Sequence, residues 1–268
     1  MGRGILKVVA LGAVLAAVAC DPTVIVNGIG NVDNTDFVAT ERFLFTIAVT
    51  TQTQFNLAGI NGNIRITGDP AATAITVAGE RKVGSNSSAD ARAHLPGLRV
   101  EVDERSNEIV VRTEQPEDTR GRNYTVDYVV TVPNGMRQVI GNVNGNITVT
   151  GIPADAIVGN VNGNIDITGV VGTLVVGLVN GNVTADITLP DGDHAELATV
   201  NGNLTLTVQE AVSARFEAGW VNGGFTISGL TLTDQVLTQA SVRGTLGSGA
   251  GSIEMGLTNG QIAVRGRP

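Results

Sequence analysis

Aromatic residues are scarce in this chain of 268 residues, which has six Phe, two Tyr and one Trp. A broad core built on packed helices would normally contain more bulky side chains. Glycine is abundant instead, with 35 residues, and no stretch after residue 20 combines a helical period of apolar residues with a cap at each end. The composition therefore predicts a thin interior of Val, Ile, Leu and Ala inside an all-β fold.

Cysteine and basic residues are also few. The single cysteine, Cys20, excludes an internal disulfide. The 17 Lys and Arg residues face 25 acidic ones, and a chain without residues 1–19 would lose Arg3 and Lys7 and no acid, which leaves a net charge of −10. An acidic chain without basic clusters is poorly suited to bind nucleic acid or anionic head groups through charge. We therefore expect no nucleic-acid partner.

The longest apolar run near the start, Val8–Ala19, has twelve residues, whereas a transmembrane helix needs about 20. The run follows two basic residues and ends in Ala17-Val18-Ala19-Cys20, with small residues before the cysteine. This stretch resembles a bacterial lipoprotein signal peptide, although Ala17 stands where that motif usually has leucine. The resemblance implies an exported chain anchored to a membrane through a lipid on Cys20. The alternative is an ordinary secretory signal, which also exports the chain.

Residues that catalyse reactions or bind metal ions form no recognisable cluster. The two histidines, His94 and His194, lie in different regions, and neither has another His or a Cys at ligand spacing. The segment Asp191-Gly192-Asp193 offers oxygen atoms to calcium, but it is also a good turn sequence without any metal. The chain has no phosphate-binding glycine loop and no Gly-x-Ser-x-Gly motif. We therefore expect no metal site, no cofactor and no catalytic residue.

What the chain does contain is a repeated short motif centred on Asn-Gly. Strong copies are residues 143–147, 161–165, 179–183 and 200–204, weaker ones are 221–225 and 258–262, and 242–246 is a candidate decayed copy. Successive copies are 18, 18, 21, 21, 21 and 16 residues apart, which is typical of the coils of a β-solenoid. With an earlier copy at residues 60–64, the predicted turn residues are Asn61, Gly62, Asn144, Gly145, Asn162, Gly163, Asn180, Gly181, Asn201, Gly202, Asn222, Gly223, Asn259 and Gly260.

Alternation around these turns supports the same fold. Asn and Gly tolerate positive φ, so Asn-Gly marks a tight turn. In the repeat around Gly163 the odd positions, including Ile157, Val161 and Ile165, are apolar or Gly, and the even positions are mostly polar. We therefore expect the odd positions to face inward, and a step of 21 residues to reverse this parity. The predicted fold is a β-solenoid, similar to a single-stranded β-helix, with coils of about 18–21 residues.

The sequence divides into four regions. Residues 1–19 form the signal peptide, 20–40 a tether, 41–140 a less regular N-terminal β region, and 141–268 the solenoid of Asn-Gly repeats. The N-terminal region contains a charged hairpin, with strands near residues 98–102 and 109–112 and a turn at Ser106-Asn107. We interpret the hairpin as a solvated edge or cap that prevents end-to-end strand pairing. A charged binding site is the alternative.

One stretch carries a family resemblance. The strand end Val130-Thr131-Val132-Pro133-Asn134-Gly135 leads directly into the first strong repeat. This order, followed by successive V-N-G-x-I coils, resembles the bacterial putative-adhesin family of the DUF4097 type over roughly residues 41–266. The resemblance implies a β-strand-repeat solenoid at the cell envelope, in a family that includes members linked to envelope-stress responses. It implies no catalytic residues.

Two groups of side chains are candidates for ligand binding. If the coils stack in register, their asparagines form a column that hydrogen-bonds along the solenoid axis or, alternatively, binds sugars. Trp220, with Phe216 and Phe225 nearby, is a candidate stacking platform for a carbohydrate, although such a cluster more often fills a core. Asp166 and Asp186 are 20 residues apart, close to one coil, so they are candidates to approach each other across the stack.

Two functions compete. The first is a non-enzymatic, lipid-anchored envelope protein that presents a β-solenoid as an adhesion surface, scaffold or stress-linked interaction module, with an envelope protein or a glycan as partner. The second is a polysaccharide-binding or polysaccharide-active β-helix protein. Enzymatic hydrolysis would need paired carboxylates about 5–9.5 Å apart, which the scattered acids of residues 141–268 do not suggest. We favour the non-enzymatic function.

Overall fold

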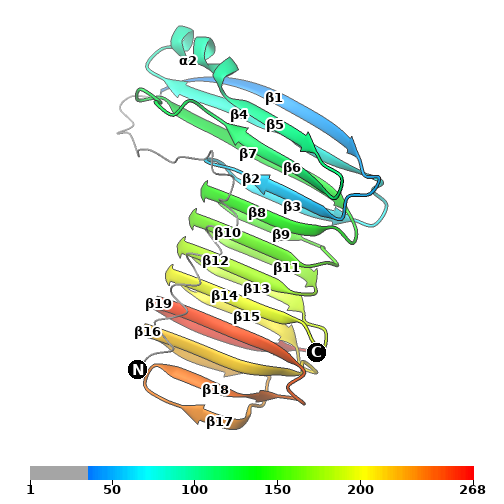
Figure 1. Cartoon of the computed structure of the whole chain (residues 1–268). Helices are drawn as coiled ribbons and strands as arrows, with labels where there is room; N and C mark the ends of the chain where they lie inside the picture. Colours follow the sequence, from blue (N-terminus) through cyan, green and yellow to red (C-terminus); the bar gives the residue numbers. More distant parts are fainter. Residues whose placement is uncertain (1–35) are drawn as a thin grey trace.

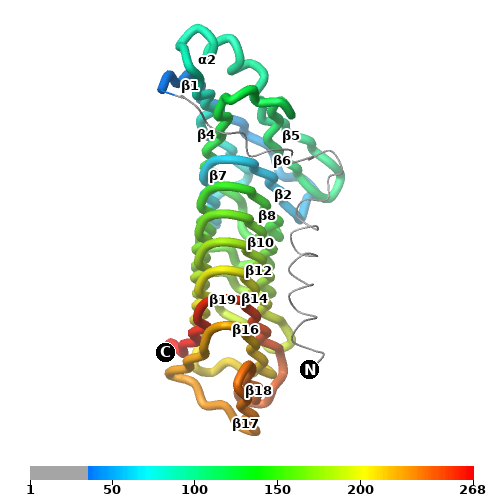
Figure 2. Tube along the Cα trace, turned by 90° about the vertical axis from the view of Figure 1, so that its left-hand side faces the viewer, coloured from blue at the N-terminus to red at the C-terminus, as the bar shows by residue number. Residues whose placement is uncertain are grey.

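A computed structural model describes residues 36–268 of the chain. The predicted signal peptide, the predicted lipidation site at Cys20 and most of the predicted tether lie outside the described residues. The described part is a long stack of coils, drawn as an upright rod in Figure 1 and end-on to the strands in Figure 2. Its strands form one continuous hydrogen-bonded sheet that folds at the Asn-Gly corners into two faces. This is the all-β solenoid that the repeat predicts.

Each regular coil contributes one strand to each face. The strand before the Asn-Gly corner lies in what we call face 1, and the strand after it lies in face 2. The regular coils are β2(Gln54–Ala58) with β3(Ile64–Asp69), β8(Arg137–Asn144) with β9(Ile147–Thr150), β10(Ala156–Asn162) with β11(Ile165–Val171), β12(Leu174–Asn180) with β13(Val183–Thr188), and β14(His194–Asn201) with β15(Leu204–Gln209). Neighbouring coils pair in parallel with equivalent residues side by side, for example Asn162 with both Asn144 and Asn180.

The four coils from β8 to β15 stack in sequence order, but the coils at the two ends of the rod do not. The long strand β19(Gly251–Arg267) lies between the β14–β15 coil and β16(Ala214–Ser228), although it comes last in the chain. The coil of β2 and β3 likewise pairs with β8 and β9 on one side. On its other side it pairs with β6(Glu108–Glu114) and β7(Asn123–Pro133). At both ends the chain therefore builds an outer layer around a coil taken from elsewhere in the sequence.

The strands at the N-terminal end pair in antiparallel fashion, and this end carries the only α-helix within residues 36–268. Face 2 continues from β7 to β4(Ala74–Ser85) and ends at β1(Phe37–Ala48). Face 1 ends with the hairpin of β6 and β5(Arg99–Glu104), as predicted from the charged segment. The short helix α2(Ser88–His94) and the 3-10 turn η1(Leu95–Gly97) cover part of this end. Helix α2 was not predicted, because seven residues are too few to show a helical period. The N-cap of α2 is Ser87, whose Oγ accepts a hydrogen bond from the Asp90 N–H.

The C-terminal end is stepped. On face 1, the first part of β16 pairs with β18(Ser241–Leu246), which pairs with β17(Thr233–Leu237). On face 2, the second part of β16 pairs with β19 and is the outermost strand of that face within residues 36–268. Residues 242–246 are therefore part of an antiparallel strand, and the prediction of a decayed turn there is wrong. Arg243 and Gly244 pair directly with Glu217 and Phe216, so the segment runs straight.

Two predicted boundaries also differ from the structure. The strand β1 begins at Phe37, inside the segment interpreted as a tether, because alternating apolar residues already start there and pair with β4. The strand β8 runs across the predicted boundary at residue 140. The N-terminal region and the repeats are joined by the same parallel ladders, so no break separates them within residues 36–268.

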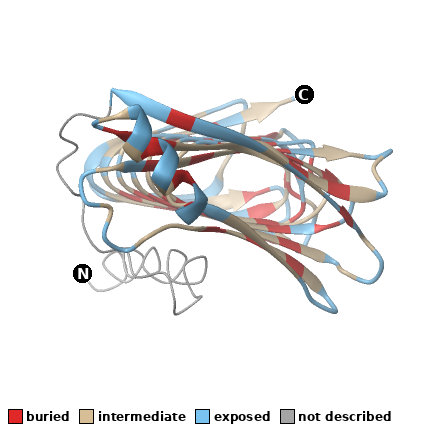
Figure 3. Cartoon of the chain, turned by 90° about the horizontal axis from the view of Figure 1, so that it is seen from above, coloured by how far each residue is buried: buried red, intermediate tan, exposed pale blue. Residues whose placement is uncertain are grey.

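The interior is narrow and aliphatic, as the composition predicts. Buried residues form strips along the inner sides of both faces, visible from above in Figure 3. In β11 the odd positions Ile165 and Ile167 are buried, but in β10 the buried side chains are those of Ala156, Val158 and Asn160, and Gly159 is the only odd position that is buried. The prediction that Ile157 and Val161 face inward is therefore wrong, because the Asn-Gly corner switches the inward parity within each coil. The reversal after a step of 21 is confirmed in β15, where Leu204, Leu206 and Val208 are buried.

No helix within residues 36–268 combines the length and apolar character needed to cross a bilayer.

Candidate functional site

The asparagines of the corners form a continuous ladder of side-chain amides along the rod. Each Nδ2 donates to the Oδ1 of the next asparagine toward the N-terminal end, at 2.7–2.9 Å. The first member, Asn61, donates to the backbone carbonyl of Tyr124 at 3.0 Å. From the N-terminal to the C-terminal end, this first ladder contains Asn61, Asn144, Asn162, Asn180, Asn201, Asn259 and Asn222. The predicted column therefore exists, with Asn259 inserted before Asn222.

The glycines of the corners are required by both backbone conformation and space. Gly163 has a φ of 128°, and a Cβ at this position would lie 2.1 Å from the carbonyl oxygen of Gly145 in the coil above. The other corner glycines also have positive φ, between 117° and 144°; they are Gly62, Gly145, Gly181, Gly202 and Gly260. Gly223 is the exception among the predicted turn residues: its φ is not positive, and β16 runs through this corner as one continuous strand.

A second ladder lies two residues after the first. Here the side-chain oxygen of each asparagine accepts a hydrogen bond from the backbone N–H of its neighbour at 2.8–3.0 Å. The members are Asn63, Asn146, Asn164, Asn182, Asn203 and the N–H of Gln261. The repeated N-G-N therefore has two roles: its first asparagine links side chains, and its second links a side chain to the backbone of the next coil.

An ion pair closes the N-terminal end of the second ladder. The Asp127 carboxylate accepts from the Asn63 N–H at 2.8 Å and from Lys82 Nζ at 2.7 Å. Partial burial alone would raise the pKa of Asp127, but these two donors together bring it below its usual value. The hydrogen bonds to Asp127 and then Glu80 raise the pKa of Lys82. Both groups are therefore held in their charged forms.

Two further asparagines point inward, which the sequence analysis did not foresee. Asn160 is completely buried, although its even position predicts exposure to water. Its Nδ2 donates to the carbonyl of Gly145 at 2.8 Å, and its Oδ1 accepts from the Val161 N–H at 3.0 Å. Asn142 lies one coil above and donates to the carbonyl of Gly62 at 3.0 Å. These side chains tie the corners to face 1 from inside the coil.

Threonines from distant parts of the sequence form a straight column on the outer side of face 2. Six of them occupy equivalent positions on six successive strands, and within residues 36–268 their hydroxyl groups have no hydrogen-bond partner. In spatial order they are Thr46, Thr76, Thr131, Thr67, Thr150 and Thr168. Asp186 and Thr207 continue the column. Only the stacking of the coils creates this array.

The ladders and the threonines together make an outer surface with few charges, which we call the polar face. It consists of four outward residues from each of the five regular coils. Ten of these residues are asparagine, seven are threonine, and only Arg65, Asp166 and Asp186 carry charge. The members are Asn61, Asn63, Arg65, Thr67, Asn144, Asn146, Thr148, Thr150, Asn162, Asn164, Asp166, Thr168, Asn180, Asn182, Thr184, Asp186, Asn201, Asn203, Thr205 and Thr207.

The three aromatic residues of the predicted platform lie at the end of the interior. Trp220 pairs with Leu257, which is buried, so Trp220 occupies an inward-facing position on β16. Its ring is parallel to that of Phe225, with 6.3 Å between centroids and an interplanar angle of 6°. Phe216 is buried and packs on Phe225 at 5.5 Å. The rings therefore pack against the core, with Trp220 and Phe225 only partly covered.

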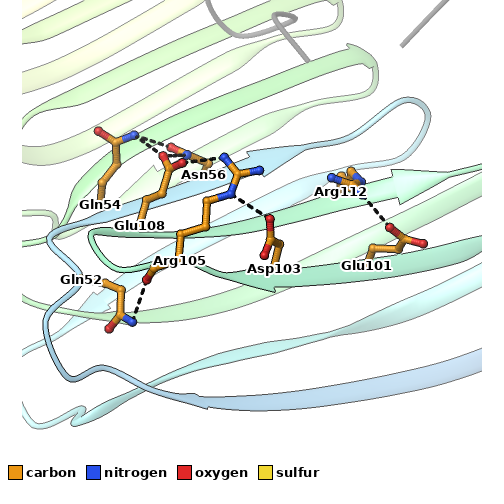
Figure 4. Close-up of polar contacts among 8 residues, drawn as sticks. All are labelled: Gln52, Gln54, Asn56, Glu101, Asp103, Arg105, Glu108 and Arg112. Carbon is orange, nitrogen blue, oxygen red and sulfur yellow. Dashed lines mark hydrogen bonds and ion pairs between the residues drawn. The ribbon is translucent and has the colours of Figure 1, made fainter. Parts of the chain in front are cut away.

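Charged side chains of the hairpin form ion pairs with one another (Figure 4). Arg105 reaches Asp103 and Glu108, both at 2.8 Å, and Arg112 reaches Glu101 at 2.8 Å. Glu108 also accepts from Asn56 at 2.6 Å, which ties the hairpin to β2. The charges therefore stabilise and protect the edge strand β5, consistent with its interpretation as a solvated edge.

A second charged cluster surrounds helix α2. Arg122 holds the Asp90 carboxylate through two hydrogen bonds, at 2.6 and 2.8 Å. Arg122 and then Ser85 bring the pKa of Asp90 far below its usual value. A shallow cleft of about 270 Å³ lies beside this pair, lined by His94, Pro116, Asp118, Arg120, Arg122 and Tyr124. No sequence pattern indicates this cleft, because its residues come from helix α2, the loop before β7 and β7 itself.

The remaining candidates are dispersed. His94 ends α2 and contacts the Asp90 carbonyl at 2.9 Å, whereas His194 begins β14. Asp191-Gly192-Asp193 forms a turn in which the Asp193 N–H donates to Pro190 at 3.2 Å. Within the described residues no three His, Cys, Asp or Glu residues lie close enough to hold a metal ion.

The two acids considered for hydrolysis lie on adjacent strands but not as an opposed pair. Asp166 pairs with Thr184, and Asp186 pairs with Thr168. Asp186 is bound by Arg267 at 2.7 Å.

Comparison with known proteins supports the fold and no more. No protein-family model and no curated protein matches the chain. A solved structure described as a putative cell adhesion protein from Clostridium sporogenes aligns with a TM-score of 0.51 and 11% identity over 85% of this chain and 100% of that one. A putative adhesin from Bacteroides fragilis covers 85% of this chain and 97% of that one, also at 11% identity, but with a TM-score of 0.30. At such low identity the first similarity shows a shared β-rich architecture.

Proposed function

We propose that this chain is a non-enzymatic protein of the bacterial cell envelope, anchored through a lipid on Cys20, in which the solenoid presents the polar face as an adhesion or scaffold surface. The polar face is the observation that supports this most directly. Seventeen of its twenty side chains are asparagine or threonine, and the ladders hold the asparagines in fixed positions. A rigid, regularly spaced array of hydrogen-bonding groups is suited to binding an extended surface, since little side-chain entropy is lost on contact.

Binding to envelopes tests this proposal. The chain from Asp21 to Pro268 should bind saturably to isolated bacterial envelopes, and the double substitution Thr150→Glu and Thr168→Glu should weaken that binding at least tenfold. Ser252→Glu and Thr258→Glu place two equal charges on the outer side of face 1 and serve as the matched control. Equal binding of both variants would contradict the assignment of the polar face.

A hydroxyl-rich polysaccharide is the second candidate ligand. Threonine hydroxyls and asparagine amides each supply both donors and acceptors, as a neutral sugar requires, and the six aligned threonines have no partner within residues 36–268. A glycan array probed with and without calcium would distinguish this candidate. Saturable binding to one neutral glycan, lost in Thr150→Glu and Thr168→Glu, would favour it; retention of envelope proteins without a glycan signal would favour the scaffold.

The lipid anchor needs a separate test because Cys20 lies outside the described residues. The full chain expressed in a bacterium should incorporate a labelled fatty acid, partition into the membrane fraction and lose residues 1–19. Cys20→Ser should abolish the label and release the protein from the membrane fraction. An exported chain that is cleaved but never labelled would contradict lipidation and indicate an ordinary secretory signal.

A further inference from the structure

One edge of the solenoid is left unprotected. On face 2, residues 221–228 of β16 pair with β19 on one side, and no strand of residues 36–268 pairs with the other side. The segment has no charged residue and no proline. The other edge strands have features that disfavour pairing with a further strand. The strands β5 and β1 carry charged side chains, and β17 has an irregular register and a positive φ at Asp234. An unguarded edge strand is a template for a further strand.

The first ladder is also incomplete at this end. Every amide donates toward the N-terminal end, where Asn61 finishes on the backbone carbonyl of Tyr124. At the other end Asn222 donates to Asn259 at 2.9 Å, but within the described chain its own Oδ1 accepts nothing, and the side chain is exposed. The ladder polarity therefore leaves one acceptor ready for another asparagine, beside the unprotected edge of β16.

The sequence contains one more asparagine of the right kind. Seven triplets of a β-branched residue followed by Asn-Gly occur within the described residues, and all seven contribute to the first ladder. The eighth, Val26-Asn27-Gly28, lies outside the described residues. We propose that residues 26–32 of a second copy of the chain add to the edge of β16 as a parallel strand, with Asn27 donating to Asn222.

The length of the chain indicates a second copy rather than the same molecule. Nine strand-to-strand steps separate β1 from β16 along face 2, and the added strand makes ten. Ten steps of about 4.8 Å amount to about 48 Å. The ten residues from Val26 to Asp36 reach at most about 36 Å when fully extended. The donor must therefore come from a neighbouring molecule.

The register of the proposed strand follows from Asn27 beside Asn222. Gly30 then lies next to Phe225, and Val32 lies next to Ile227, two positions whose side chains are only partly buried in the free molecule. The added strand would cover both and satisfy the free backbone groups of β16. Because donor and acceptor are different surfaces at opposite ends of the rod, the contact is head-to-tail and generates open chains of molecules.

Sedimentation of the chain from Asp21 to Pro268 tests the assembly. We expect the mean mass to rise with concentration, and deletion of residues 21–33 to leave a monomer with an unchanged melting temperature. Thr226→Lys with Ser228→Lys should also give a monomer, because charge guards an edge. The matched control is Thr205→Lys with Thr207→Lys, at equivalent positions two strands inward, and it should still assemble. An equimolar mixture of the deletion and the Thr226/Ser228 variant should form a finite dimer.

Cross-linking tests the register. The chain from Asp21 has no cysteine, so Asn31→Cys with Thr226→Cys introduces the only pair, and the proposal places these residues side by side on neighbouring strands. Oxidation should yield a series of disulfide-linked multimers, whereas Asn31→Cys with Thr205→Cys should not. A monomer at all concentrations, or a deletion variant that assembles as well as the parent chain, would overturn the proposal. A monomeric parent that loses thermal stability on deletion would show that the segment binds its own molecule, which also overturns it.

Discussion

The side chain of Asn259 donates a hydrogen bond of 2.8 Å to Asn201, although the two residues are 58 positions apart in the sequence. Between them the chain forms β15, β16, β17 and β18, and then returns to place β19 between β14 and β16. The last strand of the chain therefore joins the C-terminal end to the regular coils. The asparagine ladder records this insertion, because it passes through Asn259 before it reaches Asn222.

Removing one amide from the middle of the first ladder should destabilise the solenoid. Asn180 donates to Asn162 and accepts from Asn201, each at 2.9 Å. A net contribution of about 0.5–1.5 kcal/mol for each bond predicts that Asn180→Ala lowers the free energy of unfolding by about 1–3 kcal/mol. Urea unfolding with an unchanged slope would measure this. The control is Thr184→Ala, because the Thr184 side chain is exposed and has no hydrogen-bond partner within residues 36–268; it should change the free energy of unfolding by less than about 0.5 kcal/mol.

Two glycines with positive φ, Gly163 and Gly192, separate backbone strain from steric contact as causes of destabilisation. Gly163 combines positive φ with a contact of 2.1 Å between a Cβ and the Gly145 oxygen, whereas Gly192 has a φ of 91° and nothing within 4 Å of its Cβ. Gly163→Ala should therefore destabilise the protein by more than about 3 kcal/mol, and Gly192→Ala by about 1–2 kcal/mol, because only the backbone strain remains. Gly163→Val should be worse still. Thermal unfolding that is equally affected by both alanine variants would show that close packing of the corners is unimportant.

The buried Asn160 should tolerate leucine better than alanine. Its partner position in the next coil is Leu178, which is also buried, so the interior already accepts leucine at this level. Asn160→Leu should cost less than about 1.5 kcal/mol in unfolding free energy. Both substitutions remove the hydrogen bond to the Gly145 carbonyl, but only alanine also leaves a cavity, so Asn160→Ala should cost about 2–3 kcal/mol. A reversed order in chemical denaturation would mean that the hydrogen bonds of Asn160 outweigh packing.

The pair of Asp127 and Lys82 should make the stability of the N-terminal end depend on pH. The pKa of Asp127 is lowered on folding, so its contribution is present above its usual value of 3.8 and is lost as the pH falls through the folded value. The pKa of Lys82 is raised, so its contribution is present below 10.5 and is lost as the pH rises through the folded value. The difference in melting temperature between the parent chain and Asp127→Asn should therefore be largest near neutral pH and shrink below about pH 4. A difference that stays constant from pH 7 to acid would contradict this role of the ion pair.

Local signals determined the coil itself. Asn-Gly demands a corner, and its spacing gives the number of residues in a turn of the solenoid, because the backbone requirement is contained in the dipeptide. The charged hairpin was also predictable, since its alternating strands and turn lie within one short segment. Helix α2 was not predictable, because its seven residues make only about two turns and show no apolar period.

The inward parity of each coil could not be obtained from the repeat alone. In β10 the sequence offers Ile157 and Val161 on one side and Val158 with Asn160 on the other, and hydrophobicity favours the first pair. The structure buries the second pair, with the same parity as Val176 and Leu178 at the paired positions of β12, and the Asn160 amide is accommodated by a hydrogen bond to the Gly145 carbonyl. A buried polar group with both partners present is a tertiary solution that a hydrophobic pattern does not express.

The sequence by itself determined that the chain forms thin β coils with asparagine corners, because turn geometry and alternation act between residues close in the chain. Only the tertiary structure decided the order of those coils, since parallel pairing depends on which edges meet and not on which segment comes next. That order aligned Thr46, Thr76, Thr131, Thr67, Thr150 and Thr168 in one column. It also placed Asn259 before Asn222 and so left the Asn222 acceptor at the open end.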